Sequence, residues 1–396
     1  MEKVTGTIIS PKGFRGAGLH CGLKKRKKDL GWIYSDVPCQ VAGVFTTNLV
    51  QAAPVTYTKA LVKKGQAQAI IVNSGNANAC TGEQGLKDTA TMAQLAGAAL
   101  AIDPELVAVA STGIIGQPLP METVAQGIAS LTKGGSGRDF QQAILTTDTC
   151  EKSVVYQAVI AGQLVTVAGC GKGSGMIHPN MATMLGFVTT DAAVEPGVLQ
   201  ELLAELTETT FNQITVDGDT STNDMVLVLA NGQAGNSEIQ PNTLEYQVFK
   251  ELLAAVLTTL AKAIAKDGEG ATKLIEVVTQ GALDDLQARM ISKTIVGSPL
   301  VKTALFGKDP NWGRILCAIG YSGADLDVNQ LTIRIGELPV FAQGVPVVFC
   351  KEAMTQYLEK PELLIQVDLA HGAGQGRAWG CDLTYDYVKI NALYHT

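Results

Sequence analysis

The sequence predicts an α+β protein in which mixed sheets and helices form layered sandwiches. Short segments rich in Val and Ile, which are typical of strands, recur along the whole chain. Between them lie amphipathic segments in which apolar residues return every three or four positions, as in helices. Some strand pairs are separated only by a tight turn such as Ala161–Gly162, which argues against a purely parallel, doubly wound sheet.

The individual elements follow from these patterns. Strands are expected over Val4–Ser10, Ala69–Val72, Val107–Ala110, Val154–Ile160, Leu164–Val167, Met225–Ala230 and Leu274–Val278. Helices are expected over Leu86–Ala101, Gly197–Asn212 and Leu244–Lys266. Capping preferences support the last two, because Glu195–Pro196 precedes the second helix and Asp267–Gly268 follows the third.

Composition limits the class of protein. The 396 residues are 46% hydrophobic and 17% charged, which excludes a disordered chain and a coiled coil. The length predicts two or three packing units, although no linker separates them. A net charge of −7 argues against nucleic acid as a partner. The longest apolar stretch, Leu252–Ala265, is too short and too polar to span a membrane, and Met1–Val4 begins no export signal, so a cytoplasmic protein is expected.

The cysteines and histidines give little support for metal chemistry. The eight cysteines form no CxxC pair and the four histidines show no HxxxH spacing, so we expect no metal site and interpret the thiols as reduced core residues. The basic run Lys24–Lys28 is followed by Asp29 and is interpreted as a solvated turn between strands.

One Gly-rich segment, Gly169–Asp191, stands out with the sequence GCGKGSGMIHPNMATMLGFVTTD. It is not a phosphate-binding loop, because Gly173 rather than Ser or Thr follows Lys172 and no long helix begins there. The glycines at Gly372–Gly376 have the wrong spacing for a dinucleotide fingerprint and are interpreted as a turn. The remaining interpretation is a flexible backbone around a reactive bond, Ala182–Thr183.

The chemistry of such a bond needs no histidine. A Thr hydroxyl can attack the carbonyl of the preceding residue, and hydrolysis of the resulting ester cuts the chain. Thr183 then becomes an N-terminus, and its α-amine, with an intrinsic pKa of about 7.7–8, can act as the base that activates its own hydroxyl. The Ala-Thr dipeptide alone is weak support, since a Thr in a strand is usually structural.

Further motifs surround this bond: Gly43–Asn48, Asn73–Gly82, Ser111–Gly116, Asp217–Asp224, Asp267–Lys273, Asp309–Arg314 and Asn391–Thr396. Together with the cleavage segment, they make the interpretation specific, because in these segments the sequence resembles the ornithine acetyltransferase family of glutamate N-acetyltransferases nearly end to end. The resemblance implies an N-terminal-nucleophile-like fold, of the DmpA and ornithine acetyltransferase type. It also implies self-cleavage into an α chain, residues 1–182, and a β chain, residues 183–396, which fold together as one catalytic unit.

The resemblance assigns the catalytic residues. Thr183 corresponds to the family's nucleophile, and Ala182–Thr183 to its scissile bond. Thr112 and Gly113 correspond to its oxyanion hole, where a hydroxyl and an amide stabilise developing negative charge.

The resemblance also implies the positions that bind substrate. These are Thr149, Lys172, Thr183, Glu269, Asn391 and Thr396. Lys172 is expected to pair with the α-carboxylate shared by acetylornithine and glutamate, and Glu269 with the side-chain ammonium of ornithine. Asn311, Arg314 and the acidic segment Asp217–Asp224 are interpreted as polar turns that support the site rather than as metal ligands, because the closing Glu of a calcium loop is missing.

The implied reaction is a ping-pong transfer of acetyl from N2-acetyl-L-ornithine through an acetyl-Thr183 ester to L-glutamate, as in the cyclic pathway of arginine biosynthesis. No cofactor is expected, although acetyl-CoA is a candidate second donor because some family members accept it. The family pattern implies an α2β2 heterotetramer. Two alternatives stay open: an amidohydrolase or aminopeptidase of the same fold, in which water replaces glutamate, and an uncut binding protein.

Overall fold

The computed structural model describes residues 1–178 and 184–393. The larger of the two units of the protein contains a sheet whose strands follow the order β1-β6-β7-β8-β10-β3-β4-β5, with β2 paired to β3. The bounds are β1 Glu2–Val4, β2 Phe14–Leu19, β3 Leu30–Phe45, β4 Gln66–Asn76, β5 Val107–Ile114, β6 Lys152–Ile160, β7 Gln163–Lys172, β8 Leu185–Thr190 and β10 Met225–Ala230. Antiparallel pairs and the parallel pairs β8–β10 and β4–β5 occur together, so the sheet is mixed.

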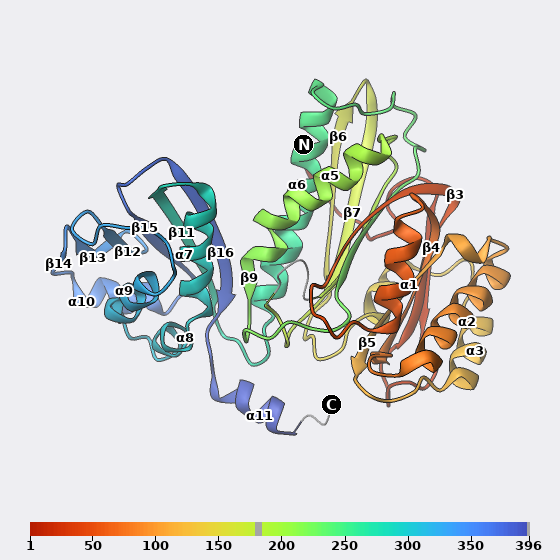
Figure 1. Ribbon diagram of the computed structural model, residues 1–396, viewed down its shortest axis with the longest axis horizontal. Coiled ribbons are helices and arrows are strands. Elements are labelled where there is room, and N and C mark those ends of the chain that lie inside the picture. The colour runs from red at the N-terminus through yellow and green to blue at the C-terminus, as the bar shows by residue number, and fades with distance from the viewer. Residues whose placement is uncertain (179–183, 394–396) are drawn as a thin grey trace.

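The long strand β3 bends this sheet into two layers (Figure 1). Its first half pairs with β2 and β4, its second half pairs with β10, and the register against β4 shifts between Tyr34 and Cys39. Successive side chains along a strand of this sheet face two different hydrophobic clusters. In β10, Val226 and Val228 pack toward helices, whereas Leu227 and Leu229 share a cluster with residues of β4 and β5. The two halves therefore lie face to face around a common core.

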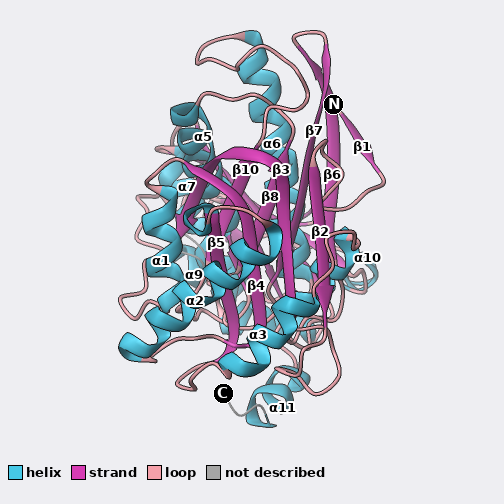
Figure 2. Ribbon diagram, turned by 90° about the vertical axis from the view of Figure 1, so that its right-hand side faces the viewer, coloured by secondary structure: helices cyan, strands magenta, loops and turns pink. Residues whose placement is uncertain are grey.

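Helices cover both outer faces of this sandwich. The helices α5 (Pro196–Thr209) and α6 (Leu244–Lys266) pack on the layer that contains β7, β8 and β10. On the other side, α2 (Gly82–Leu100) and α3 (Met121–Ser130) pack on β4 and β5, as Figure 2 shows. The helices α1 (Ala53–Val62) and α4 (Gly137–Ala143) pack beside β5 and β2 respectively. The predicted layered α+β fold is confirmed.

A second sheet forms a smaller unit beside the sandwich (Figure 1). Its order is β14-β13-β12-β15-β11-β16-β9, with bounds β9 Ile214–Thr215, β11 Leu274–Ala282, β12 Thr332–Ile335, β13 Leu338–Ala342, β14 Val345–Pro346, β15 Glu362–Asp368 and β16 Gly374–Cys381. Four helices complete it: α7 (Asp285–Gly297), α8 (Pro299–Phe306), α9 (Trp312–Gly320) and α10 (Lys351–Leu358). The side chains of Trp379 and Cys381 belong to the hydrophobic cluster around α6, so this helix packs against both sheets. The two units are therefore in direct contact, and no linker is needed to join them.

Most sequence-predicted elements are confirmed. The six internal strand predictions fall within β4, β5, β6, β7, β10 and β11, and the third helix has the predicted bounds. The side chain of Thr243 caps α6 by accepting a hydrogen bond from the amide of Tyr246. The Ala161–Gly162 turn joins β6 and β7, with positive φ at both residues as a tight hairpin requires.

Several predictions are wrong. The first strand ends at Val4, because Thr7 and Ser10 then form a turn closed by two hydrogen bonds of 2.9 Å. The cysteines are all free, but Cys80, Cys150, Cys317 and Cys350 are exposed rather than in the core. The predicted turn over Gly372–Gly376 ends early, since β16 begins at Gly374.

Among the described residues, no helix is both long and apolar enough to cross a membrane.

Candidate active site

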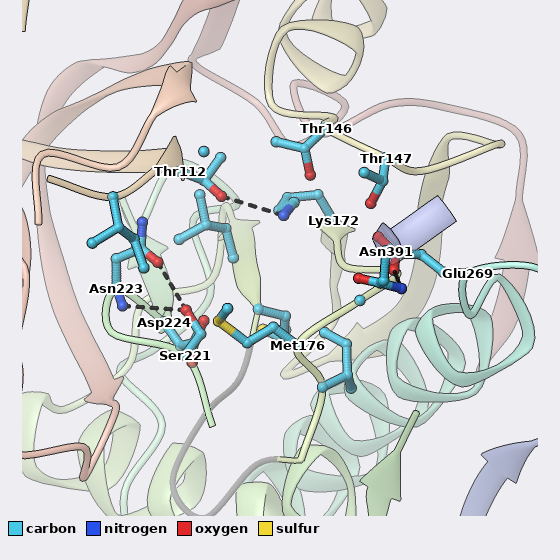
Figure 3. A pocket seen from close by; sticks show the side chains of 16 residues that line it. Thr112, Thr146, Thr147, Lys172, Met176, Ser221, Asn223, Asp224, Glu269 and Asn391 are labelled. Atoms are coloured by element: carbon cyan, nitrogen blue, oxygen red, sulfur yellow. Dashed lines mark hydrogen bonds between the residues drawn. The ribbon is translucent and has the colours of Figure 1, made fainter. Parts of the chain in front are cut away.

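A cavity of about 110 Å³ lies where the two layers of the sandwich meet at one end (Figure 3). The layer that contains β4 and β5 contributes the end of β5. The other layer contributes the end of β7 and the starts of β8 and β10, which lie together because β7 is antiparallel to β8 and β8 is parallel to β10. The lining includes Met184, which directly follows Thr183 in the sequence. The bend in β3 therefore brings together residues that are distant in the sequence.

The predicted oxyanion residues Thr112 and Gly113 line this cavity. The Lys172 ammonium donates a 3.3 Å hydrogen bond to the Thr112 hydroxyl, so the hydroxyl proton stays available for another acceptor (Figure 3). Gly113 has φ of +134°, and a Cβ there would lie 2.4 Å from the carbonyl carbon of Gly75. Only glycine fits this position without displacing β4.

Lys172 lies at the end of β7 and is buried in the cavity wall. Burial lowers the pKa of its ammonium group, although the carboxylates of Asp148 and Asp224 oppose that effect. The neighbouring amide of Gly173 donates a 2.7 Å hydrogen bond to Asp148 Oδ1. The segment therefore continues a strand and binds an internal carboxylate, which agrees with the rejection of a phosphate-binding loop.

Three buried charged side chains, Lys152, Asp148 and Asp267, form a cluster next to Lys172. The Lys152 ammonium lies 2.7 Å from Asp148 Oδ1 and 2.5 Å from Asp267 Oδ2. The side chains of Lys152 and Asp148 are both fully buried. Burial by itself would raise the pKa of Asp148, but Lys172, Lys152 and backbone donors hold it below its ordinary value. None of these three residues was predicted from the sequence to support the site.

Glu269 faces the cavity from the opposite side to Thr112, and Asn391 of α11 (Tyr385–Leu393) contacts it (Figure 3). The Asn391 amide donates a 2.8 Å hydrogen bond to Glu269 Oε2. Gly175 permits the close approach of Glu269, since a Cβ at Gly175 would lie 2.4 Å from the glutamate Cδ. Lys172 and Glu269 thus present opposite charges to one small space.

The acidic segment Asp217–Asp224 forms polar turns at the cavity, as the sequence predicted. The Asp217 carboxylate accepts hydrogen bonds from the amides of Met176 and Ile177, at 2.6 and 2.8 Å. Asp224 also lines the cavity, and its buried Oδ2 has no hydrogen-bond partner in the part of the chain that the structure describes. Burial raises the pKa of Asp224 well above its ordinary value. This unpartnered carboxyl oxygen had no sequence signal beyond the surrounding motif.

The structure does not bring every predicted residue to the cavity. Thr149 is exposed and donates hydrogen bonds to Asp267 from both its amide and its hydroxyl, while Thr146 and Thr147 of the same loop line the cavity instead. Ala182, Thr183 and Thr396 lie outside the described residues. Asn311 caps α9 by accepting a hydrogen bond from the amide of Arg314, in the unit formed by the second sheet. No cluster of three metal-ligating side chains occurs within residues 1–178 and 184–393.

Comparisons with known proteins agree with the resemblance seen in the sequence. A solved structure of the arginine biosynthesis bifunctional protein ArgJ from Bacillus halodurans shares 54% identity with a TM-score of 0.52, and the match covers 52% of this chain and 98% of that one. Proteins of the same name from Streptococcus thermophilus and Staphylococcus epidermidis are 56% and 55% identical over the full length of both chains. The model of the ArgJ family matches residues 15–396. The chain belongs to the ArgJ family.

Proposed function

We propose that the chain is the glutamate N-acetyltransferase of arginine biosynthesis, which moves acetyl from N2-acetylornithine to glutamate. The observation that carries this proposal is the pair of opposite charges, Lys172 and Glu269, on one cavity beside the start of β8. An ammonium and a carboxylate suit an amino-acid substrate, which presents a carboxylate at one end and an ammonium at the other. The names of relatives at 54–56% identity support the same pathway.

Maturation comes first in the proposed mechanism. The Thr183 hydroxyl attacks the Ala182 carbonyl, the peptide becomes an ester, and water hydrolyses that ester to leave chains 1–182 and 183–396. The Bacillus halodurans match supports a cut of this kind, since nearly the whole of that solved chain corresponds to only 52% of this one. The freed α-amine of Thr183 then serves as a base close to neutral pH.

Acetyl transfer follows in two halves. The Thr183 hydroxyl attacks the acetyl carbonyl of acetylornithine and gives its proton to the α-amine. The Thr112 hydroxyl and the Gly113 amide stabilise the oxyanion. The C–N bond breaks, the α-amine returns the proton to the leaving ornithine, and an acetyl ester of Thr183 stays behind. The amine of glutamate attacks that ester and releases Thr183, so acetyl passes between two amines without a metal or bound cofactor.

The substrate positions complete the proposal. Lys172 binds the α-carboxylate common to both substrates, and Glu269, held by Asn391, binds the ornithine ammonium. Thr149 and Thr396 retain the roles that the family pattern gives them. Acetyl-CoA is a second candidate donor, the two chains assemble as an α2β2 heterotetramer, and the enzyme works in the cytoplasm.

Two measurements test this function. Intact mass should show two fragments, the second beginning at Thr183, whereas Thr183→Ala should stay whole and inactive. Incubation with acetylornithine should give acetylglutamate only when glutamate is present. Ornithine release that ignores glutamate would identify a hydrolase instead, and a wild-type protein found only at 41.5 kDa would exclude maturation.

A further inference from the structure

The buried carboxylate of Asp148 joins three segments that surround the candidate active site. Its Oδ2 accepts a 2.9 Å hydrogen bond from the amide of Thr146. Its Oδ1 accepts a 2.7 Å hydrogen bond from the amide of Gly173, which follows Lys172, and another of 2.7 Å from the ammonium of Lys152, the first residue of β6. The Asp148 side chain is fully buried. The function proposed above gives this residue no role.

One of these segments is the loop of residues 144–151, between α4 and β6. Its residues Thr146 and Thr147 line the cavity beside Lys172 and are only partly buried (Figure 3). Asp148 directly follows them in the sequence. The hydrogen bonds that the Asp148 carboxylate accepts therefore fix where these two threonines lie relative to the end of β7.

Lys24, the first residue of the basic segment Lys24–Lys28, holds the same loop from its other end. The Lys24 ammonium donates a 2.7 Å hydrogen bond to the carbonyl of Leu145. The Lys24 amide donates a 2.8 Å hydrogen bond to the buried carboxylate of Asp29. Burial lowers the pKa of Lys24 to about 8. The sequence-based interpretation of a solvated turn is therefore wrong for Lys24, which is half-buried and supports the loop.

Asp148 also acts on the charge of Lys172. Burial lowers the pKa of the Lys172 ammonium, and the carboxylate of Asp148 raises that pKa more than any other group does. The other titratable groups that act on Lys172 are Lys24, Lys152, Asp224 and Glu269. The two lysines repel the ammonium, and burial raises the pKa of Asp224 so far that this group opposes them little. The charge of Lys172 therefore depends chiefly on Asp148.

We propose that Asp148 is a positioning residue for substrate binding, which fixes Thr146 and Thr147 at the cavity and keeps the Lys172 ammonium charged. This inference rests on the proposed binding of the substrate α-carboxylate by Lys172. A charged ammonium binds a carboxylate through a charge-assisted hydrogen bond, whereas a neutral amine at the same place loses most of that attraction. Asp148 thus acts through its neighbours and does not itself contact the substrate.

The first test compares Asp148→Asn, which removes the charge with little change in size, with Glu151→Gln. Glu151 belongs to the same loop, but its carboxylate pairs with Arg138, whose Nε lies 3.0 Å away. The KM values for acetylornithine and for glutamate at pH 7 should rise about tenfold or more in Asp148→Asn, with a smaller change in kcat. They should change little in Glu151→Gln. Intact mass should first show that each variant is cut like the wild type.

The pH dependence separates the charge of Asp148 from its packing. In Asp148→Asn the pKa of Lys172 should fall further, so the ammonium should lose its proton at a lower pH. The decline of kcat/KM on the alkaline side should therefore begin at a lower pH than in the wild type. NMR of protein with isotope-labelled lysine follows the same ionisation without relying on activity, and Lys172→Arg identifies the signal. A loss of packing alone would not move this titration.

Asp148→Glu provides a second variant if Asp148→Asn does not fold. It keeps the charge but displaces the carboxylate by one methylene group, so KM should rise while the alkaline decline stays at the wild-type pH. An unchanged KM in either folded variant, or an unchanged Lys172 titration in Asp148→Asn, overturns the inference even if acetyl passes from acetylornithine to glutamate. A Lys172 titration that moves to lower pH in a protein without acetyl-transfer activity supports the role of Asp148 and rejects the proposed reaction.

Discussion

The amide of Asn391 donates a 2.8 Å hydrogen bond to Glu269 Oε2, which ties the last helix of the chain to the candidate active site. Within the described part of α11, no residue is buried. Its attachment combines an edge-to-face contact between the rings of Tyr385 and Phe306 with polar contacts, including the 2.8 Å hydrogen bond from the Thr384 hydroxyl to the carbonyl of Gly270. The helix therefore contributes to orienting Glu269 more than to the hydrophobic core.

Replacing Asn391 with Ala should weaken substrate binding without unfolding the protein. The change removes a hydrogen bond to a carboxylate, which is worth about 1.5–3 kcal/mol, so the KM for acetylornithine should rise about tenfold or more. The melting temperature should stay near that of the wild type, because no buried side chain is lost. Lys389→Ala on the same exposed helix is the control. An unchanged KM would show that Asn391 does not position Glu269.

Replacing Gly113 with Ala should damage the candidate oxyanion hole. The new Cβ would meet the backbone at Gly75 and Asn76, at 2.4 and 2.5 Å, and φ at this position disfavours an L-residue. Loss of one oxyanion donor typically lowers kcat by about 10²–10³-fold. The matched control is Gly134→Ala, where a Cβ meets no atom within 4 Å.

Circular dichroism should accompany the kinetics of both glycine variants. A folded Gly113→Ala protein with wild-type kcat would contradict the assigned role. If that variant does not fold, Thr112→Val tests the same site, because it keeps the side-chain shape and removes the hydroxyl that Lys172 contacts.

Local patterns were sufficient to predict six strands and the helices α2, α5 and α6. The apolar repeat and the capping residue Thr243 fix the third predicted helix at Leu244–Lys266, with the bounds that the structure has. The early end of β1 was missed because Thr7 and Ser10 satisfy each other in a turn, which β-propensity does not reveal. The bend of β3 was also missed, since a register shift depends on which strands become its neighbours.

The candidate site was predicted only where the resemblance covered it. Residue types alone gave no reason to select Lys172 over other lysines. The contact between Lys152 and Asp267 joins residues 115 positions apart, and the free oxygen of Asp224 exists only because the fold buries it. Such features depend on tertiary packing, so neither composition nor spacing predicts them.

Replacing Lys152 with Met should strongly destabilise the protein. The side chain that remains has similar length, but Asp148 and Asp267 lose the ammonium that neutralises them in a buried setting. Breaking a buried pair in this way typically costs about 3–5 kcal/mol. Lys64→Met is the matched control, because its ion pair with Glu105 is exposed to solvent and should contribute little to stability. Urea denaturation measures both, and equal losses would contradict the structural role of the buried charges.

Replacing Asp224 with Asn should stabilise the protein increasingly as the pH rises. The folded pKa of Asp224 is raised, so above the unfolded value of about 3.9 the folded state holds a proton that the unfolded state has lost. Stability from this group is therefore fully present below that value and is lost as the pH rises. Asn carries no charge at any pH, so the free energy of unfolding of the variant should exceed that of the wild type by more at pH 7 than at pH 4.5. Asp36→Asn, which changes an exposed carboxylate paired with Arg15, is the control for the loss of one surface charge. A stability difference for Asp224→Asn that stays constant between these two pH values would mean that this carboxyl group does not retain its proton in the folded protein.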